Sequence, residues 1–416
     1  MTRKARSIRT LLLLSIATGL LNACASFNPV PLDQLDYMSR AETQQKDGVT
    51  VTVTVMTRKE ARQAFGGKLD KKRVQPVWIE IVNNSDKAYW LMLHGVDPDY
   101  YSVREAASVA HVANPIINDE IDEYYDAVDI EQYAAPGTTT SGFMFSNLQQ
   151  GTKEVRIRLL GEKRLLEFEF FITVPGLKAD WQRVDFQNIY TDEEIIDFDD
   201  PLEFRKTLED FLCCTTKKDG SGSGDPINMV VIGDFTELSS FIRAGWDETE
   251  IIDLGSSWRT FVSFITGGEY KTSPISALYV YGRPQDISLQ KARDTIHERN
   301  HLRLWLSPWR FQGKRVWVGG ISRDIGVFWT TRTWNLTSHA IDSEIDEARN
   351  YLLEDLATSE SLEAFGFING VGETFKENPK ENLLGTPWWT DGRRTVFVLT
   401  NEATALEEIE LLDWNR

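Results

Sequence analysis

The chain has 416 residues with 63 acidic and 45 basic side chains, which gives a formal net charge of -18. This acidity argues against nucleic acid as a partner, because proteins bind phosphate backbones through basic patches. Three cysteines cannot build a multi-disulfide framework, and the length corresponds to two or three domains of about 100 to 200 residues each.

The first 23 residues have the pattern of a signal peptide. A basic start is followed by an apolar run from Leu11 to Leu21 and then by small residues. This run is too short to span a bilayer, which takes roughly 20 apolar residues. The sequence "LNAC" resembles the bacterial lipobox, which implies that Cys24 is acylated, with palmitate among its fatty acids, and becomes the new N-terminus.

Within that resemblance, Ala25 instead of aspartate favours the outer membrane, facing the periplasm. Cleavage before Cys24 would remove four basic residues and no acids, so the formal net charge would change from -18 to -22. Such a charge keeps a protein soluble and disfavours wide contact with anionic lipid heads. We therefore expect the chain to be held at a membrane in the cell envelope through its lipid anchor.

Residues 24–47 carry few apolar side chains without a clear period, which predicts a tether. From Gly48 the pattern is that of strands, beginning with alternating Val and Thr over residues 49–55. The spacing of strands and turns predicts an immunoglobulin-like β-sandwich over residues 48–176. A helical, acidic insertion between Tyr101 and Tyr133 interrupts it, either as a binding loop or as a solvated helix.

Residues 177–211 are predicted to be a helical connector, with Pro201 at the first turn of a helix after Asp200. The remainder, residues 212–416, predicts a mixed α/β domain with one sheet and helices on one side of it. Two of its strands are expected to pair across "RFQGK". The whole chain is thus predicted to be α+β.

Cys213 and Cys214 are adjacent, so a thioredoxin-type site with two intervening residues is excluded. Three outcomes stay open in an oxidising compartment: a vicinal disulfide ring, pairing between two chains, or two buried reduced thiols.

Several separated segments after Leu212 resemble one family. They are "CCTTKKDGSGSGDPINMVVIGD", "AGW", "PISALYVYGRPQD", "RNHLRLWLSPW", "VWVGGISRDIGV" and "SHAIDSEIDEARNYLLEDL". Together they resemble the LssY-like C-terminal domain family, and the β domain before them resembles the N-terminal region of lipoproteins that carry this domain. The resemblance implies that the two cysteines belong to the folded domain. It implies no established activity.

Candidate chemistry must come from residues within these segments. His301 and Arg303 would share one face of a strand, and Asp324 and His339 follow in later segments. If they converge, His301 and His339 could bind a metal together with Asp324 or Asp342. Alternatively, the histidines could serve as acid and base around a phosphate held by Arg303. The sequence identifies no cofactor.

The acidic run after His339 also has a simple structural interpretation. Asp342 to Glu347 would surround the first turn of a helix, where negative charge complements the helix dipole. Ser343 and Asp346 have the spacing of a capping box, and Arg349 could pair with Asp346.

Trp388 and Trp389 are adjacent, and two neighbouring side chains of a strand point to opposite faces. One of them is therefore expected to meet solvent, a partner or a ligand. Two functions remain open for the chain. The first is a binding module at the membrane surface for a lipid, a glycan or an envelope protein, and the second is a periplasmic hydrolase, directed at a phosphoester or a lipid.

Overall fold

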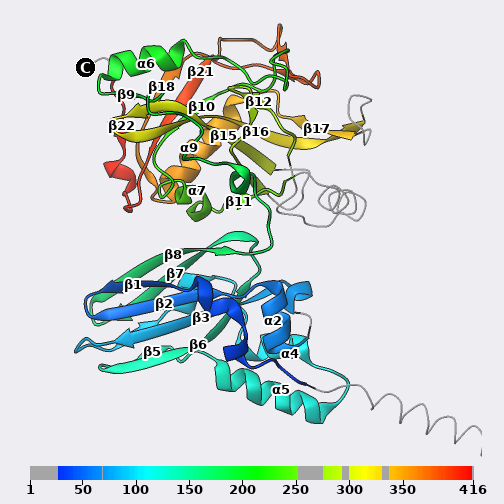
Figure 1. Cartoon of the computed structure of the whole chain (residues 1–416), viewed down its shortest axis with the longest axis vertical. Coiled ribbons are helices and arrows are strands. Elements are labelled where there is room, and N and C mark those ends of the chain that lie inside the picture. The colour runs from blue at the N-terminus through cyan, green and yellow to red at the C-terminus, as the bar shows by residue number, and fades with distance from the viewer. Residues whose placement is uncertain (1–26, 68, 252–274, 293–298, 330–336, 415–416) are drawn as a thin grey trace, which may run out of the picture. The chain divides into compact units, whose positions relative to one another are not determined.

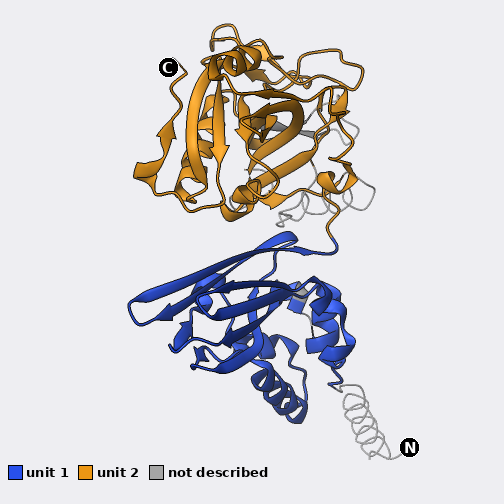
Figure 2. Ribbon diagram, turned by 60° about the vertical axis from the view of Figure 1, so that its left-hand side comes forward, with its two compact units in different colours: residues 1–176 blue, residues 177–416 orange. Residues whose placement is uncertain are grey.

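The computed structural model describes residues 27–67, 69–251, 275–292, 299–329 and 337–414 (Figure 1). The predicted signal peptide and Cys24 lie outside these residues. The fold is mixed α+β, with strands predominating. Two compact units, residues 1–176 and 177–416, are coloured separately in Figure 2 and are described one at a time. Within the described ranges, no helix has the length and apolar character needed to cross a membrane.

The first unit contains two four-stranded antiparallel sheets. Side chains on the facing sides of both sheets form one shared hydrophobic core. One sheet has the order β1 (Glu42–Lys46), β2 (Val49–Val55), β3 (Val74–Asn83), β6 (Thr138–Asn147), and the other has the order β5 (Tyr133–Ala134), β4 (Tyr89–Leu91), β7 (Gly151–Gly161), β8 (Arg164–Val174).

The alternating sequence of β2 explains how this core forms. Its four valines are completely buried, whereas Thr50 and Thr52 on the other face are only partly covered. A strand directs successive side chains to opposite faces, so the predicted period of two places every valine of β2 in the core.

Helices cover the outer face of the first sheet (Figure 1). Met144 of β6 faces the core between the sheets, while its neighbours Phe143 and Phe145 pack against the helices. Two of these helices form the acidic insertion predicted between Tyr101 and Tyr133, and they bury Ile121 while their acids face outward. The helices are α2 (Arg58–Phe65), α4 (Val103–Ala110) and α5 (Pro115–Val128), and a short helix α3 (Leu93–Val96) follows β4.

The structure corrects the predicted tether of residues 24–47. Residues 42–46 form β1, the edge strand that pairs with β2. Tyr37, in a short 3-10 helix before it, is 5% exposed and belongs to the helical core. An edge strand needs only one hydrogen-bonded neighbour and can carry polar side chains on both faces, so its sequence lacks the apolar alternation that would reveal it.

The second unit is built on a ten-stranded sheet. Two short two-stranded ribbons, β12 (Tyr279–Val280) with β13 (Arg283–Pro284) and β19 (Lys380–Glu381) with β20 (Pro387–Trp388), accompany it. The sheet order is β11 (Asp247–Glu248), β14 (Ile287–Ala292), β15 (Arg299–Phe311), β16 (Lys314–Trp329), β10 (Met229–Ile232), β21 (Arg393–Leu399), β18 (Leu362–Asn369), β22 (Glu410–Leu411), with β17 (Thr337–Ile341) beside β16 and β9 (Ile196–Phe198) beside β15.

Helices cover both faces of this sheet, whereas the sequence predicted them on one side. Phe204 and Leu208 of α6 (Pro201–Glu209) pack on the face that carries Val396 of β21. Arg349 of α9 (Asp346–Thr358) instead lies over Phe367, which pairs with Thr395 on the opposite face. The central strands are apolar on both sides for this reason, and a short helix α7 (Ser239–Arg243) follows β10.

The predicted helical connector over residues 177–211 is also corrected. Only α6 is an α-helix in it, and β9 joins the main sheet by pairing in parallel with β15. The three residues of β9 are too few to show a period, so only the pairing with a distant strand reveals them.

The hairpin of β15 and β16 confirms the predicted pairing across "RFQGK". Phe311 pairs with Lys314, and the two residues between them, Gln312 and Gly313, have positive φ of 51° and 81°. This is the conformation of a type I′ turn, whose twist matches that of the flanking strands. An irregularity in the register between Leu306 and Arg310 bends β15 shortly before the turn.

Candidate functional site

The first candidate site is a cluster of buried charges on β15 and β16. Alternation along β15 places Arg299, His301 and Arg303 on one face. The carboxylate oxygen Oδ2 of Asp324 lies 3.2 Å from Nε2 of His301 and 3.6 Å from Nε of Arg299. The structure thus brings together three of the predicted residues, His301, Arg303 and Asp324, and adds Arg299. We call these four residues the buried charge cluster.

Arg303 extends this cluster toward a second acid. Its Nη1 lies 3.8 Å from Oδ2 of Asp225, and its Nη2 donates a hydrogen bond to the carbonyl oxygen of Ser276 at 3.2 Å. On the neighbouring strand β14, Ser288 pairs with Arg303 and Gln290 pairs with His301 in register. This part of the sheet is therefore polar although it is buried.

Burial dominates the electrostatics of the cluster. Asp324 is 2% exposed and His301 is 6% exposed. Loss of water raises the pKa of Asp324 to about 7, although the charges of Arg299 and Arg303 act in the opposite direction. Burial also lowers the pKa of Arg303. A carboxyl that can hold a proton near neutral pH beside a histidine has the composition of an acid-base pair, but it is enclosed by the protein.

Of the other two predicted metal or catalytic residues, Asp342 has a described side chain, and it lies in a local turn outside this cluster. His339 pairs with Val327 in backbone register, and its side chain lies outside the described residues. Asp342 accepts a hydrogen bond from the backbone N–H of Glu344 at 3.1 Å, which is a local turn contact. Among the described residues, no group of three or more histidine, cysteine or acidic side chains is arranged to hold a metal ion.

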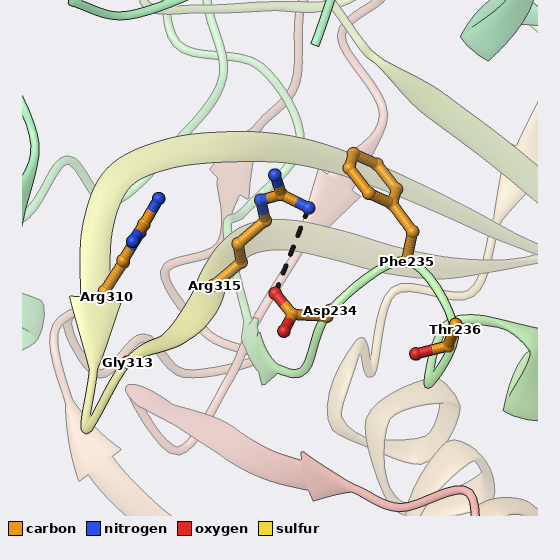
Figure 3. A pocket seen from close by; sticks show the side chains of 6 residues that line it. All are labelled: Asp234, Phe235, Thr236, Arg310, Gly313 and Arg315. Carbon is orange, nitrogen blue, oxygen red and sulfur yellow. Dashed lines mark ion pairs between the residues drawn. The ribbon is translucent and has the colours of Figure 1, made fainter. Parts of the chain in front are cut away.

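A second candidate site lies at the other end of the same hairpin. It is a pocket of about 370 Å³ lined by Asp234, Phe235, Thr236, Arg310, Gly313 and Arg315, and we call it the arginine pocket (Figure 3). Arg310 and Arg315 are direct partners across the β15–β16 ladder. Asp234, Phe235 and Thr236 come from the loop that follows β10. The type I′ turn and the end of a buried strand therefore build this pocket together.

An aromatic cluster holds the wall of the arginine pocket. The guanidinium carbon of Arg315 lies 4.4 Å from the ring centroid of Phe235, a cation–π arrangement. The Phe235 ring in turn contacts Phe186 and Trp317, with centroid distances of 4.7 Å and 5.4 Å. Trp317 is fixed by the hydrogen bond that its Nε1 donates to the carbonyl oxygen of Gly233 at 3.0 Å. The Phe235 side chain is exposed to solvent, while Phe186 and Trp317 hold its ring in place.

A smaller hollow of about 240 Å³ shares Arg310 and Arg315 with this pocket. Its other walls include Trp309 and the segment that carries Tyr190. The register irregularity of β15 falls within its lining, where Ser307 donates a hydrogen bond to the carbonyl oxygen of Val316 at 2.7 Å. Bulges of this kind redirect side chains next to sites.

Sequence reasoning missed the arginine pocket, although one signal was present. A two-residue turn at Gln312 and Gly313 makes residues 310 and 315 direct partners, so the pairing of two arginines could be read from "RFQGKR". The contribution of Phe235 could not be read, because it lies 75 positions earlier than Arg310.

Comparison with known families places these features in context. Residues 205–393 match the family model of the LssY C-terminus. This part of the chain is an LssY-like C-terminal domain. The match confirms the predicted resemblance, and it extends from α6 to the first residue of β21. No curated protein sequence matches the chain.

The LssY-like domain contains the buried charge cluster and all six residues that line the arginine pocket. The segment of Phe186 and Tyr190, which borders the smaller hollow, precedes the matched region. The second unit therefore consists of the LssY-like domain, residues 177–204 before it and residues 394–416 after it.

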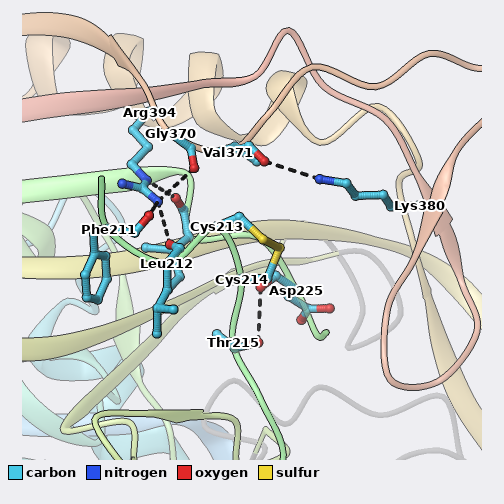
Figure 4. Close-up of a disulfide and its surroundings, with 11 residues drawn as sticks. Phe211, Leu212, Cys213, Cys214, Thr215, Asp225, Gly370, Val371, Lys380 and Arg394 are labelled. Atoms are coloured by element: carbon cyan, nitrogen blue, oxygen red, sulfur yellow. Dashed lines mark hydrogen bonds between the residues drawn. A yellow bond between two sulfur atoms is a disulfide. The ribbon is translucent and has the colours of Figure 1, made fainter. Parts of the chain in front are cut away.

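Near the start of the LssY-like domain, Cys213 and Cys214 form a vicinal disulfide (Figure 4). The structure thus selects one of the three outcomes that the sequence left open. Cys214 packs against Ile345, Val371 and Trp388, so the ring is part of the domain interior.

Arg394 holds the loop that leads to this disulfide (Figure 4). It is fully buried, and loss of water lowers its pKa to about 10. Its guanidinium donates hydrogen bonds to five backbone carbonyl oxygens, those of Leu208, Phe211, Leu212, Ile227 and Gly370. A charged side chain with this many backbone acceptors has a structural role.

Trp388 is fully buried beside Cys214, which corrects its prediction as a binding residue. Its neighbour Trp389 is partly exposed, with the ammonium group of Lys376 5.9 Å from its ring centroid. As expected for adjacent strand residues, only one of the two rings is inside. Trp389 remains the candidate for contact with a partner or ligand.

The acidic run in the LssY-like domain is the start of α9. Asp346 and Glu347 occupy its first turn, and Ala348 and Leu352 are buried. The predicted capping box is wrong, since no side-chain hydrogen bond caps this helix. Asp346 instead accepts hydrogen bonds from the Thr390 hydroxyl and the Asp391 backbone N–H, both at 2.7 Å.

The predicted pairing of Arg349 with Asp346 is present at 3.4 Å. Arg349 also forms a two-bond contact with Asp391, in which both distances are 2.9 Å. These contacts tie the first turn of α9 to the loop before β21, so Asp346 has a structural role.

Proposed function

We propose that this chain is a cell-envelope lipoprotein whose LssY-like domain is a binding module at the membrane surface. The observation that favours binding is the contrast between the two candidate sites. The arginine pocket is open and carries two arginines beside an exposed aromatic ring, whereas the members of the buried charge cluster are at most 7% exposed. A lipid, a glycan or another envelope protein is the class of partner we expect, and nucleic acid is not.

The membrane anchor in this proposal is an acylated Cys24. It is supported by the basic start, the short apolar run and the "LNAC" sequence before Ala25. These features favour the outer membrane with the protein facing the periplasm. We also propose that the first unit is an immunoglobulin-like sandwich, which is supported by its two antiparallel sheets around one core.

The anchor is tested by metabolic labelling of the full chain in bacterial cells with alkyne-palmitate. We expect label on the wild-type protein, none on Cys24→Ser, and full label on Cys213→Ser and Cys214→Ser, which are matched cysteine controls. Separation of inner and outer membranes on a density gradient should place the wild type in the outer membrane and Ala25→Asp in the inner membrane. Label that persists on Cys24→Ser would refute the anchor.

A periplasmic hydrolase, directed at a phosphoester or a lipid, is the second candidate function. It is favoured by one observation, the 3.2 Å separation of His301 Nε2 from Asp324 Oδ2 beside Arg303. In this alternative, His301, Asp324 and His339 would supply acid-base or metal-binding groups, with Asp342 as a further metal ligand and Arg303 holding the phosphate.

Metal analysis of the purified full chain by mass spectrometry separates the two functions. A stoichiometric metal that is lost in both His301→Ala and His339→Ala would favour the hydrolase. A folded, metal-free protein that gains no thermal stability from Zn²⁺, Mg²⁺ or Mn²⁺ would favour the binding module.

A further inference from the structure

The two arginines of the arginine pocket are unusual because they face each other. Arg310 and Arg315 are direct cross-strand partners, so their side chains share one face of the hairpin (Figure 3). Like charges in this position repel each other and destabilise a sheet. The only ion pair recorded for either guanidinium among the described residues joins Nη1 of Arg315 to Oδ1 of Asp234 at 3.9 Å. This distance is too long for a hydrogen bond.

The nearby acids leave the two guanidinium groups largely uncompensated. Asp197 accepts a hydrogen bond from the backbone N–H of Gly313 at 3.1 Å. Glu237 accepts hydrogen bonds from the backbone of Asp234 and from the Thr236 hydroxyl, at 2.9 Å and 3.0 Å. Asp234 itself is half exposed, and Asp192 lines the smaller hollow. Within the described ranges, no hydrogen bond is donated by the side chain of Arg310 or Arg315.

The orientation of Arg315 is set by an apolar contact. The guanidinium carbon of Arg315 lies over the Phe235 ring, 4.4 Å from its centroid, and Phe186 and Trp317 support that ring. A cation–π contact uses none of the N–H donors of a guanidinium, so they stay available for an oxyanion. The pocket is therefore preorganised, because the aromatic cluster holds the arginine in position without using its donors.

We propose that the arginine pocket binds a phosphate group carried on an organic ligand. A phosphate has at least two terminal oxygens and can accept hydrogen bonds from both guanidinium forks at once, which would also relieve their repulsion. The volume of about 370 Å³ exceeds what a bare phosphate needs, and the exposed Phe235 ring offers a surface for an apolar or aromatic part. This inference rests on the proposed binding role of the LssY-like domain and names its ligand chemistry.

The test is isothermal titration calorimetry on the full chain in a neutral detergent, with phenyl phosphate as the probe and phenol as the uncharged control. We expect phenyl phosphate to bind and phenol to bind far more weakly. Arg310→Ala and Arg315→Ala should each lower the affinity for phenyl phosphate about tenfold or more. Each variant removes a guanidinium that can donate charge-assisted hydrogen bonds to the phosphate. Asp234→Asn should strengthen binding, because it removes the acid that competes for Arg315.

Two further variants guard against misinterpretation. Lys314→Ala removes a positive charge from the same turn, where Lys314 pairs with Glu363 at 3.0 Å, and it should leave binding unchanged. Arg315→Lys keeps the charge but loses the fork, and it should weaken binding while the thermal unfolding temperature stays the same. Equal weakening by Lys314→Ala and Arg310→Ala, or no binding of phenyl phosphate to the wild type, would overturn the proposal.

The source of the phosphate is identified by a parallel titration with short-chain dihexanoyl phosphatidylglycerol. Tighter binding of this lipid than of phenyl phosphate, lost in the arginine variants, identifies a lipid headgroup. Tighter binding of phenyl phosphate identifies a soluble organic phosphate. If neither phenyl phosphate nor the lipid binds, only the proposal of a phosphate-binding pocket is rejected. The proposed lipid anchor is tested independently by palmitate labelling of Cys24.

Discussion

The β15–β16 hairpin carries arginines at both ends, and their surroundings differ. Near the open end, Arg299 and Arg303 are buried and approach the carboxylates of Asp324 and Asp225. Near the turn, Arg310 and Arg315 are only partly exposed and face one another. Burial makes an uncompensated charge very costly, and these two buried arginines lie near acids, whereas water lets a repelling pair persist at the surface. The surface pair is therefore the one available to a ligand.

The largest effect should follow removal of an acid from the buried end. Asp324→Ala leaves three cationic or basic side chains in a dry environment, and we expect a loss of about 3–5 kcal/mol in the free energy of unfolding. Asp234→Ala at the turn is the matched control, with an expected change below about 1 kcal/mol. Urea unfolding followed by tryptophan fluorescence measures this, because only Trp78 and Trp90 lie in the first unit. Equal losses of unfolding free energy in Asp324→Ala and Asp234→Ala would show that the two ends of the hairpin do not differ in this way.

The pH dependence of stability should come from the buried end as well. Because burial raises the pKa of Asp324 to about 7, the folded state retains a proton that the unfolded state releases above about pH 4. This contribution is fully present below about pH 4 and is lost as the pH rises to about 7. The free energy of unfolding of the wild type, relative to Asp324→Asn, should fall over this range by at most about 1.4 kcal/mol per pH unit.

Urea unfolding of both proteins at several pH values checks this slope. The opposite result is a free energy of unfolding of the wild type that rises with pH relative to that of Asp324→Asn. This result would mean that Arg299, Arg303 and His301 keep the carboxyl of Asp324 ionised, because their charges outweigh its loss of water. The buried end would then be a true ion cluster in the folded state.

The smallest effect is expected at the turn. Arg310→Ala should change the free energy of unfolding by no more than about 0.5 kcal/mol, because the side chain is partly exposed and its loss relieves repulsion. At low ionic strength the variant should be at least as stable as the wild type, and added salt should reduce the difference. Thermal unfolding at two salt concentrations measures both. A large loss would show that Arg310 supports the fold and would weaken the case for a ligand.

The sequence predicted an element correctly where the residues of that element alone decide its structure. The valines of β2 and the Gln312–Gly313 turn behave as their local sequence indicates. Predictions failed where a distant partner decides the outcome. The edge strand β1 and the three-residue β9 exist because β2 and β15 pair with them. Trp388 and Trp389 show the same limit, since alternation requires one ring to be inside but does not say which.

The candidate sites show the same division. Alternation along β15 predicted that His301 and Arg303 share a face, but Asp324 meets them only because β16 pairs in a particular register. Arg310 and Arg315 were readable as neighbours from the turn. Phe235 comes from the loop after β10, and Phe186, which supports its ring, comes from the segment before the LssY-like domain. Long-range contacts of this kind have no signature in a single sequence.

The sequence alone determined the acidic character of the chain, the pattern of its N-terminus, the main strands and the resemblance of its second half to the LssY-like domain. The tertiary structure decided which charges are buried and which remain open to a ligand. The reason is physical: composition and period act over a few residues, whereas the burial of a charge depends on every segment that packs around it.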